Sequence, residues 1–267
     1  MSQKVLILTA HPDDAEFMAG GTIAKLADEG NEIYEVIATN GSRGSFELDK
    51  DTLIKLRQKE AEKAGEILGK KEVFFLGYED GYLGIVPISE LREKFIYWIR
   101  RIKPNKVFTW DFWARFEFHP DHRAVAQAGM EALAFSHMPL YHPEHENKGL
   151  EPHLVAESFF FAKTPELSDI VVDISKYIDK KIEALCAHDS QMKFTVDELK
   201  MDLRAIGADD EMLVKIDRSK YRPAVELMVK AMAGAVGKKA GFEFGEEFRH
   251  ETAGGEVGRQ VLEMLKI

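Results

Sequence analysis

The sequence has little cysteine and no long apolar run, and each of these absences excludes a class of protein. Its single cysteine, Cys186, rules out an internal disulfide bond and is typical of a reducing compartment. No segment approaches the roughly 18 consecutive apolar residues that span a membrane. The apolar run at residues 5–10 is also too short for the core of a signal peptide. We therefore expect a cytoplasmic protein without a membrane span.

Basic residues are also scarce relative to acidic ones. Lysine and arginine number 36 against 46 aspartates and glutamates, which gives the 267 residues a formal net charge of −10. Binding to a phosphate backbone requires a basic surface, so we expect no nucleic-acid partner. Hydrophobic residues at 45% and charged residues at 31% indicate a globular chain that is long enough to bury a substantial core.

Strand-like and helix-like segments alternate through the first half of the chain. Short apolar runs rich in β-branched residues predict strands at 5–10, 32–40, 72–77 and 106–110. Apolar residues at helical spacing predict helices at 20–30, 51–69, 88–102 and 121–135. This alternation predicts an α/β fold with a doubly wound, mostly parallel sheet covered by helices on both faces. Such sheets bind ligands beyond the carboxyl ends of their strands.

The second half of the chain is less regular. Residues 158–163 and 169–174 predict two further strands, and residues 174–191 predict a helix. From 193 to 240 the chain has the pattern of charged helices, which we interpret as a helical insertion in a single domain spanning 1–267. The sequence does not decide whether this insertion shapes a larger substrate pocket or forms the interface of a homo-oligomer.

Two four-residue motifs carry the residues best suited to chemistry. The motif HPDD at residues 11–14 follows the first predicted strand, and HPDH at residues 119–122 follows the fourth. Taken singly, each is most simply a loop whose aspartate caps the next helix. Because both follow parallel strands at their carboxyl ends, we expect them to meet at one site. Two histidines and one carboxylate, drawn from His11, Asp14 and His122, are a ligand set typical of a catalytic zinc ion.

The remaining residues of the two motifs suggest catalytic roles. Asp13 is adjacent to two of the ligands and is a candidate general base for a water molecule on the metal. A histidine held by a carboxylate can stay protonated, so the pair His119 and Asp121 is a candidate for stabilising an oxyanion or for protonating a leaving amine. These groups together are sufficient for the hydrolysis of an amide.

The motifs resemble those of the LmbE-like, or PIG-L, deacetylases. The resemblance rests on HPDD followed by Gly-Gly-Thr, the turn at 40–41, the Arg-x-x-Glu pattern at 57–60 and HPDH followed by arginine. It covers about residues 4 to 191. It implies a Rossmann-like fold and zinc-dependent removal of an N-acetyl group from molecules that contain N-acetylglucosamine.

Carried onto the matching positions, the resemblance also implies the roles of individual residues. His11, Asp14 and His122 would bind one zinc ion per chain, and Asp13 would act as the base. His119 would polarise the oxyanion or act as the acid. The sequence leaves open whether iron or manganese takes the place of zinc in the cell.

Two further residues are substrate-binding candidates by the same resemblance. Arg57 corresponds to a family arginine near the acyl end of the substrate, and the alternative is a surface ion pair with Glu60. His153 resembles a site histidine of the branch that acts on chitin disaccharides. The aromatic segment 110–118 could form a wall for sugar rings, but core packing is the favoured interpretation.

We therefore expect a zinc-dependent hydrolase that removes an N-acetyl group from an N-acetylglucosamine-type small molecule or glycoside. The alternative is a sugar- or nucleotide-binding protein without catalysis, which is disfavoured because no Gly-x-Gly-x-x-Gly follows the first predicted strand. A metal phosphoesterase is a third option, but such enzymes usually need two metals and more carboxylate ligands than the motifs offer.

Overall fold

The apolar runs of the chain form one mixed sheet, as the computed structural model shows for residues 2–161 and 167–265. Within these ranges the strand order is β3-β2-β1-β4-β5-β7-β6. Strands β1 to β5 run parallel, and β7 is antiparallel to both of its neighbours. The last two residues of the predicted strand 158–163 lie outside the described residues. The strands are β1 (Lys4–Thr9), β2 (Glu32–Thr39), β3 (Glu72–Tyr78), β4 (Lys106–Trp110), β5 (Glu157–Phe161), β6 (Ile170–Asp173) and β7 (Gly245–Thr252).

The strand order places β1 and β4 side by side. Ile7 of β1 lies opposite Glu35 of β2 on one side and opposite Phe108 of β4 on the other. The winding of the chain reverses between β1 and β4, so the loops after them leave adjacent parallel strands at the switch point of the sheet. This arrangement confirms the predicted doubly wound α/β fold and brings the two motifs to one edge.

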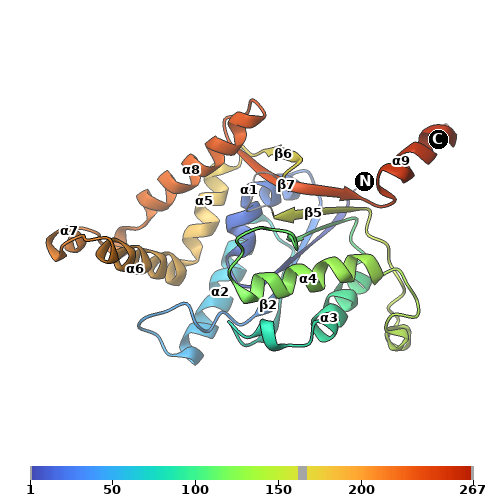
Figure 1. The fold of residues 1–267 in the computed structure, drawn as a ribbon, viewed down its shortest axis with the longest axis horizontal. Helices are drawn as coiled ribbons and strands as arrows, with labels where there is room; N and C mark the ends of the chain where they lie inside the picture. Colours follow the sequence, from blue (N-terminus) through green and yellow to red (C-terminus); the bar gives the residue numbers. More distant parts are fainter. Residues whose placement is uncertain (1, 162–166, 266–267) are drawn as a thin grey trace.

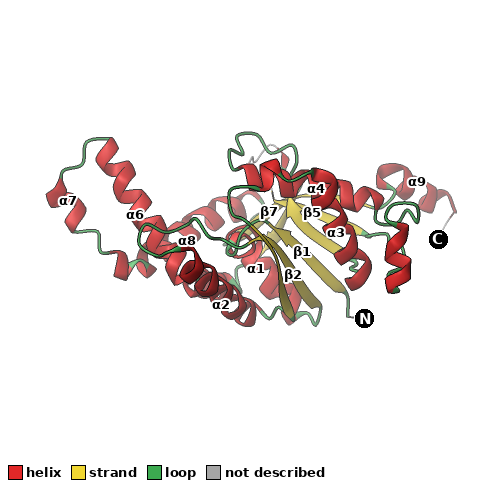
Figure 2. Ribbon diagram, turned by 90° about the horizontal axis from the view of Figure 1, so that it is seen from below, coloured by secondary structure: helices red, strands yellow, loops and turns green. Residues whose placement is uncertain are grey.

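Helices cover both faces of the parallel part of the sheet (Figures 1 and 2). The side chain of Asp49 begins α2 by accepting a hydrogen bond from the backbone of Thr52, and Gly69 ends it in the left-handed conformation at φ 79°. The helices on one face are α1 (Asp14–Asp28), α2 (Lys50–Leu68) and α5 (Ile178–Ala187), and those on the other are α3 (Ile88–Ile102) and α4 (Pro120–Phe135).

The predicted helix at 174–191 is wrong in its extent. The chain forms α5 and then α6 (Asp189–Ala205), and His188 between them has a non-helical backbone with φ −82° and ψ 56°. The cause is Glu60 of α2, whose carboxylate accepts hydrogen bonds from the backbone N–H and the hydroxyl of Ser190 at 2.8 and 2.6 Å. These bonds satisfy a free amide of the first turn and start a new helix.

The segment 193–240 is helical, as predicted. It holds most of α6, then α7 (Asp210–Val214) and α8 (Arg222–Lys239), and Figures 1 and 2 show α6 and α7 projecting beyond one side of the sheet. A second apolar cluster attaches α6 and α8 to α5 through residues that include Ile182, Met192 and Val225. The other helices are α9 (Gly255–Leu265) and the short 3-10 turns Leu83–Ile85, Pro143–Lys148 and Arg218–Lys220.

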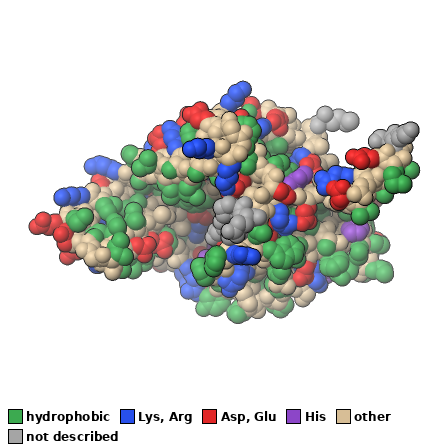
Figure 3. Space-filling model, turned by 45° about the horizontal axis from the view of Figure 1, so that its top comes forward, with side chains coloured by type: hydrophobic (Ala, Val, Ile, Leu, Met, Phe, Trp, Pro, Cys, Tyr) green, Lys and Arg blue, Asp and Glu red, His purple; other side chains and the backbone are tan. Residues whose placement is uncertain are grey.

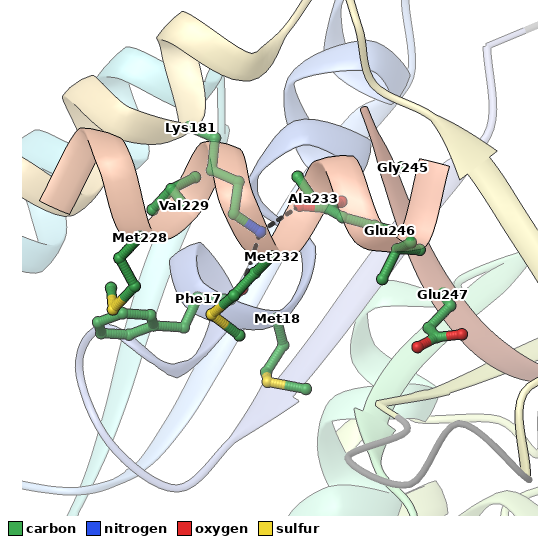
Figure 4. Close-up of a pocket in the computed structure, with 11 residues that line it drawn as sticks. Phe17, Met18, Lys181, Met228, Val229, Met232, Ala233, Gly245, Glu246 and Glu247 are labelled. Carbon is green, nitrogen blue, oxygen red and sulfur yellow. Dashed lines mark hydrogen bonds and ion pairs between the residues drawn. The ribbon is translucent and has the colours of Figure 1, made fainter. Parts of the chain in front are cut away.

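Helix α1, which begins at the HPDD motif, is broken at Ala19 (φ −143°, ψ 15°). The carboxylate of Glu246 on β7 accepts hydrogen bonds from the freed backbone N–H groups of Gly21 and Thr22 at 3.0 and 2.7 Å. Lys181 of α5 donates to Glu246 at 2.6 Å and to the carbonyl of Phe17, two residues before the break, at 2.8 Å, as Figure 4 shows. The buried ion pair therefore binds a free carbonyl before the break and two free amides after it, and so stabilises the broken helix.

None of the described helices is both long and apolar enough to cross a membrane. On the face shown in Figure 3, acidic and basic side chains are interspersed rather than gathered into fields of one sign. The surface visible there offers no basic stripe of the kind that follows a phosphate backbone.

Candidate active site

The HPDD loop turns sharply from β1 into α1. Asp13 has φ 109°, a conformation that costs free energy for a residue with a side chain, and Asp14 is the first residue of the helix. The Asp14 carboxylate accepts hydrogen bonds from the backbone N–H groups of Ala10 and His11 at 3.0 and 2.9 Å. The loop thus fixes its own carboxylate against the end of β1.

The donor nitrogens of His11 and His122 and the carboxylate of Asp14 converge at the carboxyl edge of the sheet. His11 Nδ1 lies 3.1 Å from His122 Nε2. One Asp14 oxygen lies 3.6 Å from His11 Nδ1, and the other lies 3.3 Å from His122 Nε2. Ligands about 2.0–2.1 Å from one tetrahedral ion lie roughly 3.3 Å from one another. Two imidazoles and a carboxylate at this spacing fit a single zinc ion or a chemically similar divalent metal.

The charges around this cluster keep Asp14 ionised. Burial alone would raise the pKa of Asp14, but the positive charge of His122 and a hydrogen bond from His11 hold that pKa well below its usual range. An ionised carboxylate is the form that binds a metal.

The second nitrogen of His11 is held by two carboxylates. His11 Nε2 lies 3.2 Å from Asp121 and 3.3 Å from Asp80. Asp121 also accepts hydrogen bonds from the backbone N–H groups of Gly81 and Leu83 at 2.6 and 2.9 Å. Burial would raise the pKa of Asp121, but the bonds from His11 and the two amides lower it. These carboxylates orient the imidazole in the manner common for histidines that bind a metal.

The predicted pairing of Asp121 with His119 is therefore wrong, because the Asp121 carboxylate binds His11 instead. His119 caps the start of α4, where its Nδ1 accepts a hydrogen bond from the backbone N–H of Asp121 at 3.2 Å. Since Nδ1 accepts, the neutral ring carries its proton on Nε2. Burial and the neighbouring His11 and His122 lower the pKa of His119, so the ring is a neutral donor rather than the protonated histidine expected from the sequence.

The cluster of potential ligands extends beyond the predicted three. Among the described residues, donor atoms of His11, His119 and His122 lie within 4.8 Å of one another, as do those of His11, Asp80, His119 and Asp121. His119 stands with its ring centroid 4.4 Å from that of His11 and 4.7 Å from that of His122. It is therefore close enough to contact a molecule bound at the three donors.

Arg57 supports the HPDD loop from α2. It is 3% exposed, donates hydrogen bonds to the carbonyls of Pro12 and Gly41 at 2.5 and 3.1 Å, and lies 3.3 Å from the Asp13 carboxylate. A Cβ at Gly41, which has φ +64°, would lie 2.8 Å from the guanidinium. Burial raises the pKa of Asp13 to about 6, against the opposing charge of Arg57. Arg57 therefore ties the loops after β1 and β2 together beside Asp13.

The alternative interpretation of Arg57, a surface ion pair with Glu60, is excluded. Both side chains are buried, and the Glu60 carboxylate binds Ser190 rather than the arginine. The two residues of the Arg-x-x-Glu pattern thus support different features. The arginine holds the loops after β1 and β2, and the glutamate holds the start of α6.

Trp110 is a supporting residue that the sequence analysis missed. It ends β4, is 2% exposed, and stacks on His122 with ring centroids 3.9 Å apart. Its indole N–H donates to Asp14 at 3.3 Å. One feature of the sequence could have indicated this role. Trp110 is the last residue of the predicted strand that leads to the second motif, and this places it at the carboxyl edge of the sheet.

The other large aromatic side chains of the segment 110–118 are exposed, so core packing was the wrong interpretation for them. Phe112 and Trp113 expose 43% and 54% of their surface, and Phe116 and Phe118 expose 78% and 81%. They lie on the loop between β4 and α4, next to the candidate site.

The structure does not bring His153 to this site. Its Nε2 bonds to the carbonyl of Pro104 at 2.7 Å, and its backbone N–H bonds to the carbonyl of Ser136 at 3.1 Å. Pro104 precedes β4, and Ser136 ends α4, whereas His122 lies in the first turn of α4. His153 therefore lies at the opposite edge of the sheet, and we leave it out of the proposed site.

The metal-ligand cluster opens into a pocket of about 420 Å³. Volumes of this size are typical of small-molecule sites. One wall comes from α6, so the segment 193–240 takes part in shaping the pocket. The residues that line it are His11, Asp13, Asp14, Phe17, Arg43, Gly44, Arg57, Asp80, His119, His122, Gln191, Phe194, Thr195 and Glu198.

Fold and site together define a class: a doubly wound α/β protein with a His/Asp cluster able to hold a metal at its switch point. Residues 6–133 match the PIG-L family, described as GlcNAc-PI de-N-acetylase. The chain is 34% identical over 200 residues to the diacetylchitobiose deacetylase of Thermococcus kodakarensis, covering 74% of this chain and 73% of that protein. The chain therefore belongs to the PIG-L, or LmbE-like, family of deacetylases.

Two further relatives agree with this assignment. A probable N-acetyl-α-D-glucosaminyl L-malate deacetylase of Bacillus cereus is 30% identical over 207 residues, covering 74% of this chain and 88% of the relative. The structure of N,N'-diacetylchitobiose deacetylase from Pyrococcus horikoshii, in complex with an inhibitor, superposes with a TM-score of 0.76 at 29% identity. It covers 94% of this chain and 84% of that chain, so the likeness includes most of the helical second half.

Proposed function

We propose that the protein removes an N-acetyl group from an N-acetylglucosamine-type small molecule or glycoside, with zinc held by His11, Asp14 and His122. The observation that carries the proposal is the convergence of two imidazole nitrogens, 3.1 Å apart, with the two oxygens of one carboxylate at 3.3 and 3.6 Å from them, a donor set that suits one zinc ion. The names of the relatives, which act on diacetylchitobiose and on N-acetylglucosaminyl malate, support the class of substrate.

The metal site would use His11 through Nδ1 and His122 through Nε2, together with the Asp14 carboxylate. Three protein ligands leave a coordination position open for water or substrate. A zinc ion bound there would supply Lewis-acid chemistry by activating a water molecule and polarising the amide carbonyl.

The proton transfers fall to Asp13. Its carboxylate would accept a proton from the attacking water and deliver that proton to the amide nitrogen as the C–N bond breaks, giving acetate and a free amine. Arg57, 3.3 Å away, holds the carboxylate in place. His119 would donate its Nε2 proton in a hydrogen bond to the oxygen of the former carbonyl, where negative charge develops in the transition state.

We also propose that the chain is one catalytic domain rather than two. The support is that α6, at the start of the segment 193–240, contributes side chains to the same pocket as the HPDD motif. The non-catalytic binding protein considered above is not favoured, because the edge of the sheet that would hold a cofactor is filled by the His/Asp cluster.

The test is metal content of the purified protein together with amine release from N-acetylglucosamine, diacetylchitobiose and N-acetylglucosaminyl malate. About one zinc per chain and amine release from at least one of them would support the proposal. A chain that contains no metal and takes up none from added zinc, cobalt or manganese would overturn it.

A further inference from the structure

One face of α6 forms a wall of the pocket opposite the motifs. The four pocket-lining residues of this helix are Gln191, Phe194, Thr195 and Glu198, at spacings of three, four and seven residues from the first. Positions at this spacing lie on one side of an α-helix. One side of α6 therefore faces the pocket over the stretch from Gln191 to Glu198.

This wall is fixed to the loop after β2. The Gln191 side chain donates to the carbonyl of Gly44 at 2.9 Å, and a Cβ at Gly44 would lie 2.5 Å from the Gln191 side chain. On the outside, Arg218 binds both Asp197 of α6 and Glu47 of the loop at 2.7 Å. A recognition surface needs such support to hold its side chains in one geometry.

Two side chains of the wall are suited to binding a sugar. The ring of Phe194 is half-buried and lies against Phe46 with centroids 5.0 Å apart, so it offers an aromatic surface to the pocket. The carboxylate of Glu198, one turn further along, makes no hydrogen bond or ion pair with another described residue. Among charged neighbours in the pocket, Asp13 contacts Arg57, and Arg43 contacts Glu79.

We propose that this face of α6 is a subsite for the second sugar of a neutral N-acetylglucosamine disaccharide, a role that rests on the proposed function of the same pocket. Phe194 would contact the apolar face of the second ring, and Glu198 would accept hydrogen bonds from its hydroxyls. The free carboxylate also disfavours a second unit that is itself anionic, such as malate, because two like charges would meet at this wall of the pocket.

The test compares kcat/KM for zinc-loaded wild type and Glu198→Gln on diacetylchitobiose, N-acetylglucosamine and N-acetylglucosaminyl malate. The substitution keeps the shape but replaces a charged acceptor, so the preference for diacetylchitobiose over N-acetylglucosamine should fall roughly tenfold. The preference for diacetylchitobiose over N-acetylglucosaminyl malate should fall further, because the repulsion is removed. Phe194→Leu should lower the first preference as well.

The control is Glu211→Gln, the same substitution at an exposed glutamate of α7 outside the pocket. It should leave both preferences unchanged. Equal preferences in wild type and Glu198→Gln would overturn the subsite. If the wild type releases amine from none of the three substrates, the proposed function fails. Calorimetric binding of diacetylchitobiose then still tests the subsite. Equal affinity of wild type and Glu198→Gln for this disaccharide would overturn it.

Discussion

The indole of Trp110 lies nearly parallel to the imidazole of His122, with ring centroids 3.9 Å apart and planes inclined by 14°. The same indole donates its N–H to Asp14 at 3.3 Å. One buried side chain at the end of β4 thus contacts two of the three proposed ligands, and it restricts both the rotation of the ring and the orientation of the carboxylate.

Trp110→Phe should weaken zinc binding by roughly 10- to 100-fold, because supporting residues of metal ligands typically have effects of this size. The variant keeps an aromatic ring against His122 but loses the N–H donor to Asp14. Zinc affinity is measured by competition with a chromophoric chelator. Trp113→Phe, at an exposed tryptophan of the loop that follows β4, is the matched control. An unaltered affinity in Trp110→Phe would show that the hydrogen bond does not support the site.

Asp13→Asn should retain zinc and lose activity by roughly 10²- to 10⁴-fold, the usual contribution of a general base. The amide cannot accept the proton, whereas the proposed ligands His11 and Asp14 of the same motif are unchanged. Metal content and amine release are measured on the same preparation. Asp51→Asn, at an exposed position of α2, should behave as wild type. Near-normal turnover by Asp13→Asn would assign the base to another group.

His122→Ala and His119→Ala should separate a ligand from its neighbour. Both rings belong to the same cluster within 4.8 Å, but only His122 faces Asp14 and His11 at the spacing of a ligand set. His122→Ala should lose most of its zinc after dialysis, whereas His119→Ala should keep about one ion per chain and lose turnover. The opposite pattern would exchange the two roles.

Much of the fold could be predicted from the sequence, because its signals are local. The bounds of α3 (Ile88–Ile102) and β4 (Lys106–Trp110) agree with the prediction to the residue, since apolar spacing and a following proline or motif define them. β7 was not predicted as a strand, because charged residues occupy half of its sequence GEEFRHET. One of these, Glu246, is buried by partners on α1 and α5 that lie more than 60 residues away.

The candidate site also has one part that local sequence signals predict and another that depends on contacts between distant segments. The ligand set could be expected from two motifs that follow neighbouring strands. The partner of Asp121 could not be predicted, because His119 is only two residues away in the chain, whereas the groups that bind the carboxylate are His11 and the backbone of Gly81 and Leu83. The spatial neighbours of a buried carboxylate depend on how loops after different strands pack, and periodicity within one segment carries no such information.

Glu246→Ala should lower the free energy of unfolding by about 3–5 kcal/mol, the usual cost of removing one partner of a buried ion pair. The substitution leaves the ammonium of Lys181 and two backbone amides of α1 without their acceptor. Urea unfolding of the zinc-loaded protein measures the change. Glu226→Ala, which removes an exposed partner of Lys230 on α8, should have a much smaller effect on the free energy of unfolding. Similar effects of the two variants would mean that the broken helix is stabilised by its apolar contacts and not by the ion pair.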